Sequence, residues 1–214
     1  MKQYSFIDVC QQELNGIEIP LIQRDYAQGR KQEAKKRGRF LQALHEAVKG
    51  KGISLDFIYG SLTKDKKLIP LDGQQRLTTL FLLHWYAAKR DGIAKEEWEC
   101  LGKFTYSTRI SAHLQEFTPV SESKDPISAQ IHNEAWYSLS WDNDSTVISM
   151  LQMLDDIALT FHDIDDLWEE ICKNKKITFC FRTLEDMGIT DDIYIKMNSR
   201  GKPLTDFEHF KAEL

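Results

Sequence analysis

The chain has 214 residues, of which 42% are hydrophobic and 11% aromatic, and its formal net charge is −5. This composition supports a folded core and excludes a disordered chain, and the negative charge gives no overall attraction to nucleic acid or to an anionic membrane. The four cysteines are widely spaced and form no CxxC pair or Cys/His cluster, which argues against a zinc site and predicts a reducing, cytoplasmic location. The longest apolar stretch, Leu77 to Ala88, is too short to span a bilayer.

The first half of the chain predicts strands alternating with helices. Residues 17–22 contain Pro20 and predict a short edge strand, which a polar loop follows. Helical spacing of apolar residues predicts a helix over 31–49, and the nearly continuous apolar pattern over 74–90 predicts a central buried helix. Between these helices, a strand over 53–59 and a second over 67–71 are expected to form a hairpin, with Ile53, Leu55, Phe57 and Tyr59 sharing one face.

The second half is predicted to be mostly helical. Its expected elements are a strand at 104–110, a surface loop at 118–125, an amphipathic helix at 145–161, an acidic helix at 163–172, a strand at 176–184, a turn at 198–203 and a capped helix opening at 205. That last helix is cut short, so we expect the natural protein to continue past Leu214.

A polar string, Asp72-Gly73-Gln74-Gln75-Arg76, lies between a predicted strand and the buried helix. A helix N-terminus exposes unpaired N–H groups and a partial positive charge, and both favour phosphate. Arg76 would add a forked cation suited to phosphate oxygens. Asp72 fits only if a metal ion or a water molecule separates its carboxylate from the phosphate. The alternative is structural: Asp72 is an N-cap that Gln75 reciprocates in a capping box.

Two further clusters also combine arginine with amide or hydroxyl groups. They are Gln23-Arg24-Asp25-Tyr26 and Asn198-Ser199-Arg200-Gly201-Lys202. Convergence of Arg24, Arg76, Arg200 and Lys202 on one cleft would create a polyanion site. Each cluster alone is equally compatible with a solvated turn, and the second with a helix C-cap.

Basic residues gather at one place, between Arg30 and Arg39. Lys35, Lys36, Arg37 and Arg39 are candidates for contact with DNA phosphates, the alternative being a solvated helix face. His84 falls within the buried helix pattern and is interpreted as a core histidine. The chain has no GxxxxGK[ST] motif, which excludes a P-loop NTPase.

Taken together, four motifs resemble the N-terminal domain of GmrSD-type restriction proteins. In chain order they are Ile19-Pro20 leading to Gln23-Arg24, Tyr59-Gly60-Ser61-Leu62, the DGQQR string with Leu77-Thr78-Thr79-Leu80, and Asn198-Ser199-Arg200-Gly201-Lys202-Pro203-Leu204. The resemblance spans about residues 17–214, with variable helical sequence in the middle. It implies an α+β, ParB/sulfiredoxin-like core: a small mixed sheet with helices, built from residues 1–95 and completed by 176–214, with a largely helical insertion at 96–175.

The resemblance also implies binding and hydrolysis of a nucleoside triphosphate, GTP or another, in control of a DNA nuclease used in phage defence. The nuclease would be a C-terminal HNH-type domain, absent from these residues, acting on DNA; self-association stays open. Asp72, Gln75 and Arg76 are the catalytic candidates, with Asp72 holding Mg²⁺ or orienting the attacking water and Gln75 positioning that water or reading the nucleotide. The nucleotide-binding candidates are Gln23, Arg24, Gly73, Gln74, Asn198, Arg200 and Lys202. A binding module that senses nucleotide or DNA without turnover is the alternative function.

Overall fold

The computed structural model describes residues 3–19, 25–106, 113–114, 117–119 and 125–184. In this part of the chain the strands are β1 (Gln3–Tyr4), β2 (Gly16–Ile19), β3 (Ile53–Leu62), β4 (Lys67–Asp72), β5 (Phe104–Tyr106) and β6 (Ile177–Thr183). The α-helices are α1 (Phe6–Asp8), α2 (Ala34–Lys49), α3 (Gln74–Arg90), α4 (Lys95–Trp98), α6 (Ile127–His132) and α7 (Ser145–Phe161). Short 3₁₀ or π turns occupy Val9–Glu13, Lys31–Glu33, Glu99–Lys103, Leu139–Asn143 and Glu169–Lys173. The fold is therefore mixed α/β, in agreement with the predicted combination of sheet and helices.

The described strands form one mixed sheet in the order β1-β6-β3-β4-β2-β5. β3 and β4 make the predicted antiparallel hairpin. β6 runs parallel to β3 on its other side, and the short β1 pairs antiparallel with β6 at the edge of the sheet. β2 lies between β4 and β5 and pairs in parallel with both, so the predicted edge position of this strand is wrong. Pro20, on which the edge prediction rested, lies outside the described residues.

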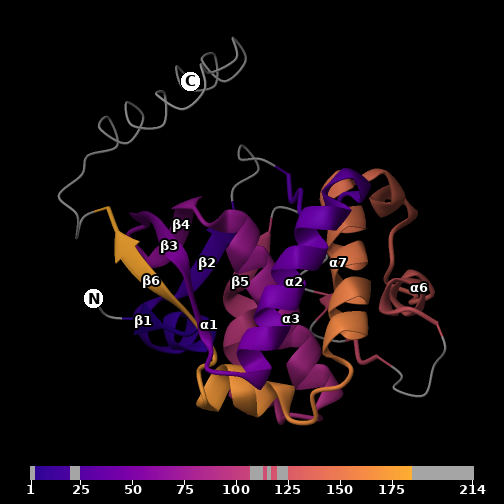
Figure 1. Ribbon diagram of the computed structural model, residues 1–214. Helices are drawn as coiled ribbons and strands as arrows, with labels where there is room; N and C mark the ends of the chain where they lie inside the picture. Colours follow the sequence, from indigo (N-terminus) through magenta and orange to yellow (C-terminus); the bar gives the residue numbers. More distant parts are fainter. Residues whose placement is uncertain (1–2, 20–24, 107–112, 115–116, 120–124, 185–214) are drawn as a thin grey trace.

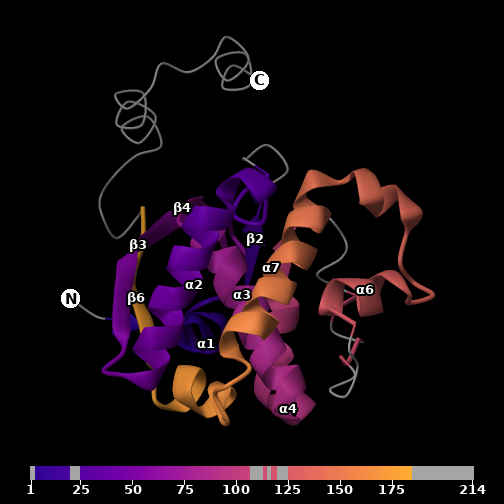
Figure 2. The same cartoon turned by 45° about the vertical axis from the view of Figure 1, so that its right-hand side comes forward.

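Helices α2 and α3 lie beside the sheet, and α7 packs against both of them on the side away from the sheet (Figures 1 and 2). All residues of α3 from Leu77 to Ala88 are buried, which confirms the predicted central helix. The Phe81 ring stacks on Phe104 of β5 at 4.5 Å between centroids, so α3 is joined to the sheet by aromatic packing. The predicted insertion, residues 96–175, thus supplies the edge strand β5 and the core helix α7. The predicted domain boundaries stay a prediction.

The predicted faces of β3 hold for only half of the strand. Its register shifts between Leu55 and Ile58, so Ile58 is fully buried and Phe57 is 44% exposed. A bulge inserts an extra residue and reverses the side-chain alternation that follows it. The prediction that Phe57 shares the face of Ile53 and Leu55 is therefore wrong.

The acidic helix predicted over 163–172 begins later than expected. Helical residues start at Leu167 and continue into the π turn Glu169–Lys173. The carboxylate of Asp91 accepts the backbone N–H of Trp168 at 2.7 Å, which supplies an acceptor in the first turn from outside the segment. Elsewhere, α7 and β6 match their predictions closely. No described helix has the length and hydropathy required to cross a membrane.

His84 is a core histidine, as predicted, with an exposed fraction of 1% and its Nδ1 at 2.7 Å from the Leu80 carbonyl oxygen. Burial lowers the pKa of His84 from its usual value of 6.5 to about 4. The unfolded chain takes up a proton near pH 6.5, whereas the folded protein resists protonation down to about pH 4, so stability is lost as the pH falls through this interval. We expect the free energy of unfolding to decrease by about 3 kcal/mol across it.

Urea unfolding from about pH 7 down to about pH 4 measures this contribution. The variant His84→Leu should show a smaller decrease than the natural sequence, whatever its absolute stability. Equal slopes in the two proteins would contradict a neutral buried histidine.

Candidate functional site

The DGQQR string forms a tight corner between β4 and α3. β4 ends at Asp72, Gly73 has φ +85°, and α3 begins at Gln74. A Cβ atom on Gly73 would lie 2.7 Å from Cγ1 of Ile58, so both the backbone conformation and the close approach require glycine. Gly73 is itself the N-cap and no side chain caps the helix, so the capping-box alternative for Asp72 and Gln75 is wrong.

Arg76 lies beneath the β3 bulge with an exposed side-chain fraction of 18%. Its Nη2 donates to the Phe57 carbonyl oxygen and to Oδ2 of Asp72, both at 2.9 Å. Its Nη1 is buried without a hydrogen-bond partner and lies 3.8 Å from Oδ2 of Asp56, whose side chain is 99% exposed. The bulge and the strand end therefore fix one side of the guanidinium through Nη2, while the buried Nη1 has the Asp56 carboxylate nearby and no hydrogen bond among the described residues.

Tyr59 is the ladder partner of Asp72 and lies on the same strand as the bulge. Burial raises the pKa of Tyr59, and the negative charge of Asp72 adds to this increase while Arg76 opposes it. The phenol of Tyr59 therefore stays neutral. The charged groups at the corner are the guanidinium of Arg76 and the carboxylates of Asp56 and Asp72.

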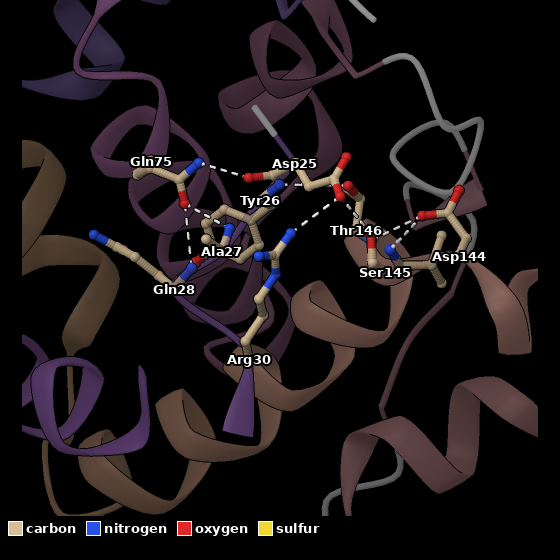
Figure 3. A network of polar contacts seen from close by, with 10 residues as sticks. Asp25, Tyr26, Ala27, Gln28, Arg30, Gln75, Asp144, Ser145 and Thr146 are labelled. Carbon is tan, nitrogen blue, oxygen red and sulfur yellow. Dashed lines mark hydrogen bonds and ion pairs between the residues drawn. The ribbon is translucent and has the colours of Figure 1, made fainter. Parts of the chain in front are cut away.

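Gln75 uses its amide to hold the loop at residues 25–28 (Figure 3). Its Oε1 accepts the backbone N–H groups of Ala27 at 2.8 Å and Gln28 at 3.2 Å, and its Nε2 donates to the Asp25 carbonyl oxygen at 3.0 Å. The structure thus brings the Asp72–Arg76 string against the loop at residues 25–28. In this arrangement Gln75 is a positioning residue.

Replacing Gln75 by alanine should lower the free energy of unfolding by about 2 kcal/mol, because two part-buried N–H groups lose their acceptor. Gln75→Glu keeps the acceptor for both N–H groups but turns an oxygen toward the Asp25 carbonyl oxygen in place of the Nε2 donor, so it should lower stability through that contact alone. Denaturant unfolding of the three proteins measures both effects. Identical stability of Gln75→Ala and the natural sequence would contradict this role.

The same loop is also attached to the N-terminus of α7 (Figure 3). Asp144 caps α7, and the neighbouring Ser145 donates to Oδ2 of Asp25 at 2.7 Å. The loop was expected to be a polar surface segment, but Tyr26 is fully buried and its hydroxyl lies 2.7 Å from Oγ1 of Thr79. Burial raises the pKa of Tyr26 far above its usual range. The first turns of α3 and α7 are therefore linked through one short loop.

The predicted DNA contacts on α2 require one correction. Arg37 is only 6% exposed; its Nε pairs with Asp156 of α7, and its Nη1 donates to the carbonyl oxygens of Gln28 and Arg30 at 3.0 Å. A cation enclosed in this way cannot reach DNA. For Lys35, Lys36 and Arg39, which are exposed, the prediction stands.

Two of the seven predicted nucleotide-binding residues, Gly73 and Gln74, are among the described residues. Gln74 is described, and its side chain donates to the Pro70 carbonyl oxygen at 3.0 Å. Gly73 forms the tight corner itself, and the other candidates lie outside the described residues: Gln23, Arg24, Asn198, Arg200 and Lys202.

The donors at the corner fit Mg²⁺ in part. Asp72 is 52% exposed and Asp56 99% exposed, and Mg²⁺ in phosphate sites is commonly held by one or two carboxylates, with phosphate and water oxygens completing the shell. Among the described residues no group of three or more His, Cys, Asp or Glu side chains is arranged to hold a metal ion. A metal ion here would therefore depend on ligands from the nucleotide.

Comparison of the sequence with models of known protein families identifies the family of this chain. The family model of the GmrSD restriction endonuclease N-terminal domain matches residues 6–214, almost the whole chain. The chain belongs to the GmrSD N-terminal domain family. The resemblance predicted from its motifs is thereby confirmed, and the domain is part of a restriction endonuclease family. A comparison with curated proteins gave no match.

Proposed function

We propose that this GmrSD N-terminal domain binds a nucleoside triphosphate at the Asp72–Arg76 corner and hydrolyses it to control a nuclease region. The observation that carries the proposal is the enclosed guanidinium of Arg76, whose Nη1 has no hydrogen-bond partner among the described residues and which belongs to the first turn of α3, where no side chain caps the helix. Preorganised donors of this kind stabilise phosphate charge without needing to reorganise. The match to a restriction endonuclease family supports the regulatory setting.

Each residue of the corner has a separate part in this proposal. Arg76 binds phosphate oxygens and offsets the charge that develops during phosphoryl transfer. Asp72 releases Arg76 when phosphate enters and then orients the attacking water or holds Mg²⁺. Mg²⁺, when bound, neutralises phosphate charge. Gln75 fixes the loop at residues 25–28 beside the corner.

Arg76→Ala should reduce magnesium-dependent phosphate release by about 100-fold or more, because the phosphate loses its main cationic contact. Asp72→Ala should also abolish turnover. The measurement is phosphate release from GTP, ATP, CTP and UTP with and without Mg²⁺. Lys64→Ala, on the exposed hairpin turn, is the control and should turn over normally. Unchanged turnover in Arg76→Ala would remove the proposed site.

One observation favours the second candidate, a module that binds nucleotide without hydrolysing it. The amide of Gln75 is fully engaged with backbone groups, so Asp72 is the one candidate at the corner left to orient water. In this case a nucleotide raises the melting temperature, because it binds the native state selectively, while no phosphate is released. Thermal-shift and phosphate-release assays on the same sample separate the two functions.

A further inference from the structure

Exposed basic side chains cluster on the first half of α2 and the turn before it. We define the α2 cationic face as Lys31, Lys35, Lys36 and Arg39, all of which are exposed. Lys36 is 82% exposed and pairs with Glu33 at 2.9 Å, an exposed contact that contributes little. The whole chain carries a net charge of −5, so this concentration of positive charge opposes the overall balance.

The position of these cations is unfavourable for the helix itself. The first turn of α2 contains no acidic residue, and its N-cap Glu33 makes no side-chain capping hydrogen bond. The N-terminus of a helix carries partial positive charge, so lysine and arginine there lower helix stability. Acidic residues in this first turn would stabilise the helix better than the lysines present. A sequence that departs in this way from the most stable choice is expected at functional surfaces.

Gly38 is a second departure on the same surface. It lies inside α2, in the second turn, where glycine is about 1 kcal/mol less favourable than alanine. It is exposed, and a Cβ atom built on it would have no neighbour within 4 Å. No contact with any residue that the structure describes requires this glycine. Helical spacing places Lys35 and Gln42 one turn to either side, so the bare backbone is flanked by a cation and an amide.

Arg37 holds this face in a fixed orientation. It is buried on the opposite side of α2, paired with Asp156 and bonded to the carbonyl oxygens of Gln28 and Arg30. These carbonyls belong to the loop that Gln75 holds against the start of α3. The α2 cationic face is thus joined through one loop to the Asp72–Arg76 corner.

We propose that the α2 cationic face docks on the phosphodiester backbone of duplex DNA, with Gly38 allowing the helix backbone to approach the phosphates closely. Lysine and arginine clusters neutralise DNA phosphates independently of base sequence. The aromatic residue next to Arg39, Phe40, packs against the core, so it offers no stacking platform for single-stranded bases. The family match to a restriction endonuclease selects DNA among polyanions. The proposal does not depend on nucleotide hydrolysis.

The test is binding of a labelled duplex by the full chain as a function of salt. The variant Lys35→Glu/Lys36→Glu/Arg39→Glu should bind about tenfold or more weakly and lower the salt slope by about 3. The control variant Lys64→Glu/Lys95→Glu/Lys173→Glu makes the same charge change on other exposed lysines, one of which is also paired with an acid, Glu169. It should lose much less affinity. Equal losses in the two variants would show that net charge alone matters and would overturn the proposed surface.

Substitutions of Gly38 test the proposal separately from any loss of folding, because the expected changes in stability and in DNA affinity have opposite directions. Gly38→Ala should raise the melting temperature and yet weaken DNA binding, and Gly38→Gln should weaken binding further. Both variants should keep any nucleotide-induced thermal shift, so failure of the nucleotide proposal would leave this result unaffected. DNA affinity of Gly38→Gln equal to that of the natural sequence would overturn the close approach at this position.

Discussion

Replacing Gly29 by alanine is expected to lower the free energy of unfolding by about 3 kcal/mol. The loop passes directly over the backbone of α7, and a Cβ atom on Gly29 would lie 1.8 Å from the carbonyl oxygen of Ser149. Both sides of this contact are backbone, so no side-chain rotation relieves the overlap, and the loop or the helix must move. Thermal or denaturant unfolding of the variant measures the cost.

The matched control is Gly38→Ala, which adds the same methyl group where nothing lies within 4 Å. It should raise stability by about 1 kcal/mol, because alanine is the better helix former. Since the Gly29 loop also contacts Gln75, the Gly29 variant should additionally reduce nucleotide-induced stabilisation. Equal melting temperatures for Gly29→Ala and the natural sequence would contradict the close packing of loop and helix.

The elements that could be predicted from the sequence are those with a strong local signal. α3 and α7 have long apolar patterns with helical spacing, and both were predicted with the bounds that the structure shows. The β3–β4 hairpin has a short polar connection, in which Lys66 takes a positive φ of 58°. In each case the information lies within about 20 residues, so the pattern suffices without knowledge of the tertiary partner.

The features that were missed depend on partners far away in the chain. The β3 bulge is defined by its register with β6, more than 100 residues later, so alternation alone misplaced Phe57. The acidic partner of Arg37, Asp156, is likewise on α7, and the arginine was interpreted as a surface charge. β1 and α1 received no prediction, although Ser5 and Asp8 form a capping box that was readable in the sequence.

For the candidate site, the sequence identified the corner but not its internal contacts. Gly73 and Arg76 could be selected because a strand, a turn and a helix follow one another there. That Gln75 holds the 25–28 loop became apparent only from the fold, because its partners lie about 50 residues earlier. The clearest signal in the sequence was the density of amides and arginines around Tyr26, which suited a solvated turn equally well.

The ion pair of Arg37 and Asp156 gives the second large expected effect. Asp156→Ala leaves the guanidinium of Arg37, which is 6% exposed, with two carbonyl oxygens and no counter-charge. Removing one partner of a buried pair typically costs about 3–5 kcal/mol, because the remaining charge is uncompensated. Asp156 itself is 29% exposed, which admits water and places the expected loss at the lower end, about 3 kcal/mol.

Two variants make this measurement specific to the pair. Asp156→Asn keeps an acceptor for Arg37 while losing the charge, so it should fall between Asp156→Ala and the natural sequence. Glu96→Ala removes an exposed carboxylate on α4 and should leave stability within about 0.5 kcal/mol. Denaturant unfolding gives all three values. Because Arg37 connects α2 to the loop beside Gln75, Asp156→Ala should also weaken DNA binding through the α2 cationic face. If the variant lost stability but kept its DNA affinity, the Arg37–Asp156 pair would have no part in orienting that face.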